Sequence, residues 1–225
     1  MARVKVLLWC GLVGGPLFLA VFLLNDRFKA DYDPVRDYVS EASIGPGGWV
    51  QIANFLVTGA LVVAFSLAAR RVVSRWTGIL LTLFGAGLML AGVFVTDPAP
   101  YGHRTPHGIA HDLISLVVFT SLPAAAFTAA RWRPTRLWRA YCYAVGISIP
   151  ILLAIFTASS TAGGVFQRLT ITVAMTWCAA LALRALKTLS PVRPDGAPEA
   201  GSQPSAPPLT QTRPPASQGR SAPLA

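Results

Sequence analysis

Asp97-Pro-Ala-Pro-Tyr-Gly-His-Arg-Thr-Pro-His-Gly-Ile-Ala-His-Asp112 is the stretch around which the fold of this chain can be read. It holds all three histidines of the chain and lies between two long uncharged apolar runs, residues 76–96 and 113–130. Apolar runs of about 20 residues are long enough to cross a bilayer as helices. The stretch between them is therefore expected to connect two membrane helices at one face of the membrane.

Four further uncharged runs extend this pattern over most of the chain. Only 12% of the residues are charged, about half of what a soluble domain carries. These features predict an all-α, polytopic integral membrane bundle and argue against a soluble helical core. The six transmembrane helices are expected at about residues 6–24, 48–69, 76–96, 108–130, 140–158 and 164–186, in one domain over residues 1–189.

Residues 190–225 differ in composition from the rest of the chain. They contain nine prolines in 36 residues and are otherwise rich in Ala, Ser, Gln and Arg. Such a segment has too little apolar surface to bury a core. We expect a disordered Pro-rich cytoplasmic tail.

The distribution of positive charge predicts the orientation. The formal net charge is +10, but the arginines cluster beside the apolar runs, which favours orientation signals over nucleic-acid binding. Eleven Lys and Arg residues fall at one end of the expected bundle and five at the other. The positive-inside rule places both termini in the cytoplasm of a multi-pass protein of the cell (plasma) membrane. Its partners are then the bilayer and anionic lipids at the arginine clusters; the oligomeric state stays open.

Small residues predict where helices approach closely. Ala60, Ala64 and Ala68 recur every four residues in the second run, and Gly85 and Gly92 lie in the third. Small residues at helical spacing let the backbones of membrane helices come into contact. We expect one packing surface on each of these two helices.

A layer of polar side chains is expected about one helical turn inside the outer boundary. Ionisable groups at that depth are costly unless they are paired or face a wet cavity. Arg168 is expected to pair with Asp112, Asp97 or Asp37. The candidate pocket residues are Asp37, Glu41, Gln51, Asn54, Asp97, His111, Asp112, Gln167 and Arg168.

Three chemistries are compatible with this layer. His103, His107 and His111 are four residues apart, so His107 and His111 form a candidate zinc pair, although Pro106 separates His103 from the helix. His111 beside a carboxylate is compatible with acid–base or proton-coupled work. The third interpretation is a structural hydrogen-bonded cluster. Two histidines on one helix are only a weak indication of a metal site, so we expect no cofactor.

Several short motifs resemble one protein family. They are Tyr32-Asp33-Pro34, Ser40-Glu41, Gly45-Pro46-x-Gly-Trp49, Asn54, Val95-Thr96-Asp97-Pro98, His111 and Gln167-Arg168. Together they resemble the DUF998 family of six-span bacterial and archaeal membrane proteins of uncharacterised function, over about residues 6–186. The resemblance implies six spans and a membrane location, and it implies no activity.

The leading hypothesis is a non-enzymatic integral membrane protein. An outward-facing polar pocket would bind a lipid headgroup, a small polar ligand or a membrane partner. The alternative is a membrane enzyme or proton-coupled transporter that uses His111, Asp112, Asp97 and Arg168. The sequence identifies no catalytic residue.

Overall fold

A computed structural model describes residues 1–99 and 102–189 of the chain. Within this part there are six α-helices, one short 3₁₀ helix and no strand. They are α1 (Ala2–Phe28), η1 (Val39–Ser43), α2 (Trp49–Val72), α3 (Arg75–Val93), α4 (Pro106–Ala129), α5 (Arg136–Ala158) and α6 (Gly163–Leu189). All six α-helices are long and apolar enough to cross a membrane, which confirms the predicted fold class. The expected tail, residues 190–225, lies outside the described residues.

Three helices begin at a hydroxyl side chain that caps the first turn. Ser74, Thr105 and Thr135 each accept a hydrogen bond from the backbone N–H three residues later, at 3.0–3.1 Å. These N–H groups have no acceptor inside the helix, so the caps stabilise the helix starts. Pro106 occupies the first position of α4, where its missing N–H costs nothing. The cap and the proline together fix His111 in the second turn of α4.

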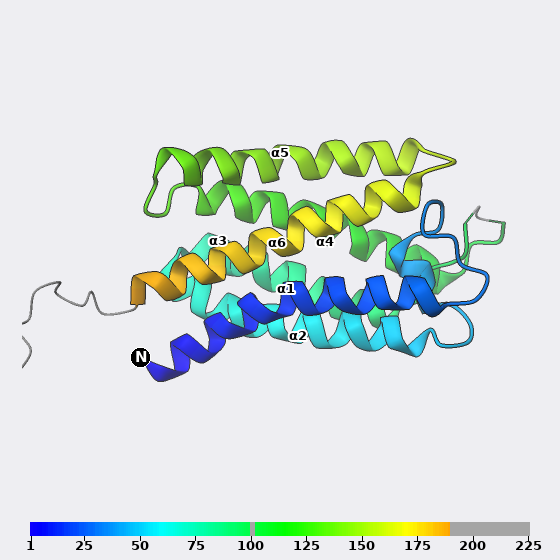
Figure 1. Cartoon of the computed structure of the whole chain (residues 1–225), viewed down its shortest axis with the longest axis horizontal. Helices are drawn as coiled ribbons and strands as arrows, with labels where there is room; N and C mark the ends of the chain where they lie inside the picture. Colours follow the sequence, from blue (N-terminus) through cyan, green and yellow to red (C-terminus); the bar gives the residue numbers. More distant parts are fainter. Residues whose placement is uncertain (100–101, 190–225) are drawn as a thin grey trace, which may run out of the picture. The chain divides into compact units, whose positions relative to one another are not determined.

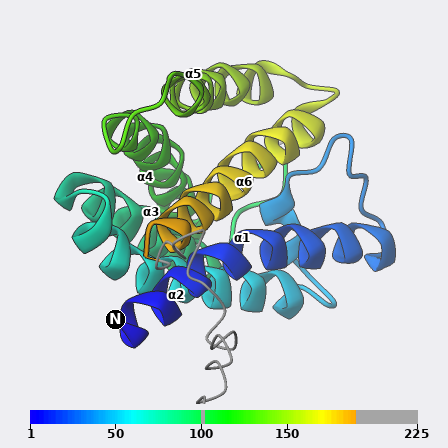
Figure 2. The same cartoon turned by 60° about the vertical axis from the view of Figure 1, so that its left-hand side comes forward.

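Neighbouring helices in the chain pack against one another, and α1 also packs against α6 (Figures 1 and 2). The most extensive contact joins α2 and α3. There, a Cβ on Gly59 would lie 2.5 Å from the carbonyl oxygen of Gly85, and a Cβ on Gly85 would lie 2.8 Å from that of Gly59. The two backbones are therefore in direct contact, as small residues in membrane helices permit.

The contact corrects one detail of the predicted packing surfaces. Gly85 and Gly92 of α3 face α2 as expected, with Gly92 close to Phe55. On α2, however, Gly59 makes the backbone contact and Ala60 is exposed. Of the three predicted alanines, Ala60 is exposed and Ala68 is fully buried, so the backbone contact at Gly59 lies beside the predicted spacing.

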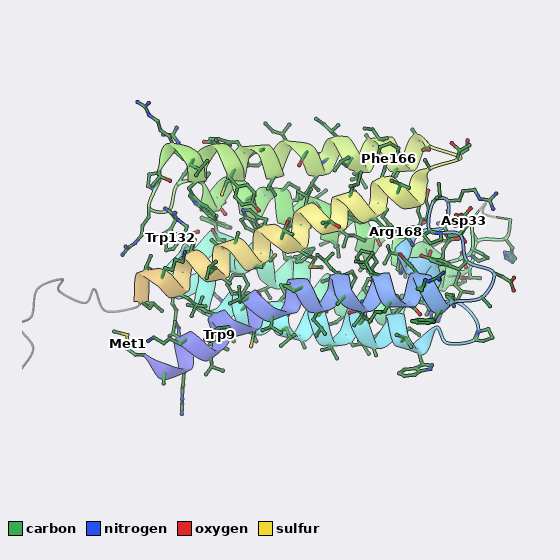
Figure 3. All side chains as sticks on the ribbon, viewed as in Figure 1. Met1, Trp9, Asp33, Trp132, Phe166 and Arg168 are labelled. Carbon is green, nitrogen blue, oxygen red and sulfur yellow. The ribbon has the colours of Figure 1, made fainter. Side chains whose placement is uncertain are left out.

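The two ends of the bundle differ in character. The arginine end comprises the start of α1, the α2–α3 and α4–α5 connections and the end of α6. The polar end comprises residues 29–48, 94–99, 102–105 and 159–162. Figure 3 shows Met1, Trp9 and Trp132 towards the arginine end, and Asp33, Phe166 and Arg168 towards the polar end.

Helices α4 and α5 meet at the arginine end and diverge towards the polar end (Figures 1 and 2). Helix α5 instead approaches α6 at the polar end, where residues 159–162 connect them. The groove described below, which is lined by residues of both helices, lies between these diverging parts.

Candidate functional site

Arg168 lies in the second turn of α6 and uses all five of its N–H donors. Its Nε and Nη2 donate to the two carboxylate oxygens of Asp26, both at 2.8 Å. Nη2 also donates to the Tyr32 hydroxyl at 2.6 Å, and Nη1 donates to the carbonyls of Asp37 and Gly164 at 2.8 and 3.1 Å. A guanidinium has no further donor. Arg168 therefore ties α1, residues 32–37 and α6 together.

The acidic partner of Arg168 is Asp26, so the prediction of Asp112, Asp97 or Asp37 is wrong. Helix α1 runs one turn further than expected, and this carries Asp26 to α6. Asp37 supplies only its backbone carbonyl. The paired side chains of Arg168 and Asp26 are 12% and 10% exposed, which places the ion pair among buried ones.

Tyr32 extends this cluster. Its hydroxyl accepts from Arg168 and donates to the Tyr38 carbonyl at 2.9 Å. Burial raises the pKa of the Tyr32 phenol above its ordinary value, because the charged form is poorly solvated there. The phenol therefore stays protonated and keeps its role as a donor.

Glu41 joins η1 to the segment that follows α3. Its two carboxylate oxygens accept from the backbone N–H groups of Tyr38 and Ala99, both at 2.6 Å. The residue is 8% exposed, and this burial raises the pKa of the carboxyl group. Glu41 thus acts as a clasp between two loops of the polar end.

Asp97 and Asp112 hold the loop before α4. Asp97 accepts from the Thr105 N–H at 2.9 Å and the Thr105 hydroxyl at 2.7 Å, and these bonds lower the pKa of its carboxyl group. Arg104 lies 3.8 Å from Asp97 and pairs with the half-buried Asp112. Both carboxylates therefore have partners within this loop.

Gln51 and Asn54 lie deeper, between α1 and α2. The Asn54 amide donates to the Phe18 carbonyl at 3.2 Å and to the Gln51 side-chain oxygen at 3.4 Å. The Gln51 nitrogen is buried without a partner among the described residues. Neither residue lines the two cavities described below.

His111 has a defined proton position. It is 4% exposed, and its Nδ1 lies 2.7 Å from the Phe94 carbonyl oxygen and 3.2 Å from that of Ala91. A carbonyl only accepts, so Nδ1 carries the proton. Helix α3 ends at Val93 rather than near residue 96, which leaves the Phe94 carbonyl available. In the neutral imidazole, Nε2 then presents a lone pair, with no partner among the described residues.

Gln167 is oriented in the same way by one backbone bond. Its side-chain oxygen accepts from the Val39 N–H at 2.6 Å, which directs the NH₂ group away from that bond. The residue is 7% exposed. Its NH₂ group has no acceptor among the described residues, so two donors remain available.

Two cavities meet at these side chains. The groove has a volume of about 550 Å³ and lies between the diverging parts of α4 and α5, with Leu116, Leu153 and Phe156 among its apolar walls. The inner cavity has a volume of about 50 Å³ and lies among apolar side chains of all six helices, Phe18 and Phe55 included. Asp112 lines the groove, whereas Glu41, Asp97 and Arg168 line neither space.

The residues that line both cavities include four polar ones, Ser40, His111, Ser115 and Gln167, which we term the neck. Their free atoms are two hydroxyls, the His111 Nε2 and the Gln167 NH₂ group, none with a partner in the described part of the chain. Ser40 and Ser115 were not predicted as pocket residues. Ser40 lies in η1 and was noted only as part of the Ser40-Glu41 motif, and Ser115 lies in α4.

His107 does not join His111 in a metal site. Its ring is exposed and lies against Phe94, with the ring centroids 5.5 Å apart. Across residues 1–99 and 102–189, no three His, Cys, Asp or Glu side chains are grouped as a metal site requires.

Comparison with known proteins confirms the family resemblance of the sequence. A family model described as a protein of unknown function, DUF998, matches residues 12–184. This range runs from α1 to α6 and includes the neck. No curated protein and no solved structure matches the chain.

Proposed function

The chain belongs to the DUF998 family, and we propose that it is an integral membrane protein that binds the polar group of a membrane-borne ligand at its neck, without chemical turnover. One observation carries this proposal: four polar side chains converge where two cavities meet, and their free atoms lack partners among the described residues. None of these atoms is among the side-chain atoms that are fully buried without a partner in the described part of the chain, so they are open to the cavities. A ligand in the groove could therefore reach them, and each hydrogen bond that it formed would contribute about 0.5–1.5 kcal/mol.

The dimensions of the groove support the same proposal. Its volume of about 550 Å³ falls within the roughly 300–1,000 Å³ of typical small-molecule sites. Leu116, Leu153 and Phe156 give it apolar walls, and its polar lining consists of the neck together with Tyr38, Thr96, Asp112 and Thr157. This division suits a ligand that has a small polar group and an apolar body.

A membrane enzyme or proton-coupled transporter is the second candidate. It would use His111, Asp112, Asp97 and Arg168, and a base of this kind needs a partner that relays or stabilises charge. His111 donates to a carbonyl rather than to a carboxylate. All five N–H donors of Arg168 are already used, by the Asp26 carboxylate, the Tyr32 hydroxyl and two backbone carbonyls. Binding without turnover therefore fits these contacts better.

A bulky side chain in the groove tests the proposal. Ala154 lines the groove on α5, whereas Ala140 is exposed on the same helix near the arginine end. We expect purified Ala154→Phe to retain at least about fivefold less co-purifying ligand than the wild type, because the ring fills the space. Ala140→Phe is the matched control. Lipid extraction and mass spectrometry of the three proteins measure the difference, and equal ligand content would contradict the proposal.

We also propose that the polar end faces the outside of the cell. The arginine end would then lie on the cytoplasmic side and contact anionic lipids of the cytoplasmic leaflet. Clusters of Arg beside the spans support this orientation. A cysteine at Gly102, whose Cβ would meet nothing within 4 Å, is expected to react with a membrane-impermeant maleimide in intact cells. Arg71→Cys is expected to react only after permeabilisation. The reverse pattern would overturn the orientation.

A further inference from the structure

We propose that the ligand of the neck is a long-chain fatty acid. Its carboxyl group binds at the neck, and its single acyl chain lies in the groove between α4 and α5. This inference rests on the proposed function and names the class of ligand. It follows from the donors and acceptors of the neck, from the charges around it and from the sizes of the two cavities.

The neck offers one acceptor beside several donors. The His111 Nε2 accepts, because Nδ1 carries the proton that is donated to Phe94. The Gln167 NH₂ group donates, because its oxygen is occupied by the Val39 N–H. A carboxylic acid has the complementary pair, an O–H that donates and a carbonyl oxygen that accepts. The hydroxyls of Ser40 and Ser115 supply further partners on either side.

The surrounding charges disfavour a phosphate head. Phosphate groups are held by several charged donors, most often Arg or Lys. The three arginines nearest to the neck in the chain pair with carboxylates: Arg168 with Asp26, Arg104 with Asp112 and Arg36 with Asp33. A head with a single carboxyl group needs no such cation, because it binds as the neutral acid or passes its proton to His111.

The sizes of the two cavities indicate that the acyl chain of the fatty acid lies in the groove. The inner cavity, about 50 Å³, has room for a few atoms, whereas the groove, about 550 Å³, has room for one chain. Leu116, Phe119, Pro150, Leu153 and Phe156 give the groove its apolar lining. A ligand that enters from lipid gains little from this lining, since lipid tails are as apolar as the side chains. The head group therefore determines the selectivity.

Binding of tritiated palmitic acid to the full-length protein in nanodiscs tests the inference. We expect saturable binding that palmitic acid displaces at least about tenfold better than methyl palmitate, which lacks the O–H for His111. We expect lysophosphatidylglycerol to displace it at least about tenfold less well. Equal or better competition by either compound would overturn the fatty-acid assignment.

Variants of the neck locate the site. Gln167→Glu keeps an oxygen for the Val39 N–H and removes the NH₂ donors; His111→Asn keeps an N–H for Phe94 and removes Nε2. Each is expected to weaken palmitate binding about tenfold, the loss of roughly one strong hydrogen bond. Ser115→Ala, the mildest change, is expected to weaken it about threefold. Ser121→Ala, on the same helix but outside both cavities, is the matched control and is expected to bind as the wild type does.

The outcomes separate this inference from the proposed function. If Ser115→Ala and Ser121→Ala had the same affinity for palmitate, the acid would bind outside the neck, and this result would overturn the inference. A wild-type protein that holds a ligand lost in Ala154→Phe, but that does not bind palmitate, would overturn the fatty acid and leave the neck as a binding site. Wild-type protein without any ligand and without palmitate binding would overturn both.

Discussion

Replacement of Arg168 by Met is expected to lower the free energy of unfolding by about 3–5 kcal/mol, the cost of leaving one member of a buried ion pair without its partner. Asp26 would remain as a carboxylate that is only 10% exposed. The same change frees the Tyr32 hydroxyl and two backbone carbonyls. Unfolding in mixed micelles, followed by circular dichroism, measures the loss.

An exposed ion pair of the same loop provides the control. Arg36 pairs with Asp33 at 2.9 Å, with side chains that are 66% and 42% exposed. Such pairs contribute about 0–1 kcal/mol, so Arg36→Met is expected to change stability by less than about 1 kcal/mol. The double variant Asp26→Leu, Arg168→Met is expected to recover part of the loss, because no uncompensated charge remains. Equal effects of Arg168→Met and Arg36→Met would contradict the structural role of Arg168.

Substitution of Gly59 by Leu is expected to destabilise the bundle by at least about 3 kcal/mol, the upper range for overpacking. The first atom of the new side chain would lie 2.5 Å from the Gly85 carbonyl oxygen and 2.9 Å from the Met89 backbone nitrogen. Backbone atoms cannot rotate away as a side chain does, so α2 and α3 would have to separate.

The adjacent residue serves as the control for this change. Ala60 is exposed on α2, and Ala60→Leu is expected to change stability by less than about 0.5 kcal/mol, as surface substitutions usually do. Both variants add apolar bulk to the same helix. A comparable loss from Ala60→Leu would show that α2 and α3 do not meet at Gly59.

The helices could be predicted because the bilayer sets a length that apolar runs reveal directly. In the described part of the chain, six helices long and apolar enough to cross a membrane occur where the six runs are. The ends of the helices were less predictable, and two of them decide the site. Helix α1 continues through Asn25-Asp26-Arg27, residues that the apolar pattern assigns to the loop. Helix α3 ends at Val93, inside an apolar run.

Both ends alter the partners of the candidate residues. The extension of α1 supplies Asp26 to Arg168, an ion pair between residues 142 positions apart in the chain. The early end of α3 gives His111 a carbonyl instead of the expected carboxylate. The sequence offered three aspartates as partners of Arg168, and the actual partner, Asp26, was not among them. The choice depends on which helix ends meet in three dimensions.

Only two of the four neck residues were predicted from the sequence. His111 and Gln167 are conspicuous because polar side chains near a membrane boundary need a reason to be there. Ser115 is not conspicuous, since a hydroxyl is readily satisfied by the backbone of its own helix. Its place in the neck follows from the divergence of α4 and α5, whereas that of Ser40 depends on where η1 packs against the bundle.

The most direct test of the ligand site is the mass of the intact protein released from detergent or nanodiscs under native conditions. The account predicts a wild-type population that carries one bound molecule per chain and an Ala154→Phe population that has lost it. Methylation of the extracted ligand with diazomethane is expected to identify a carboxyl group. A wild-type protein that carries no bound molecule, or one equally present in Ala154→Phe, would contradict a ligand site at the neck.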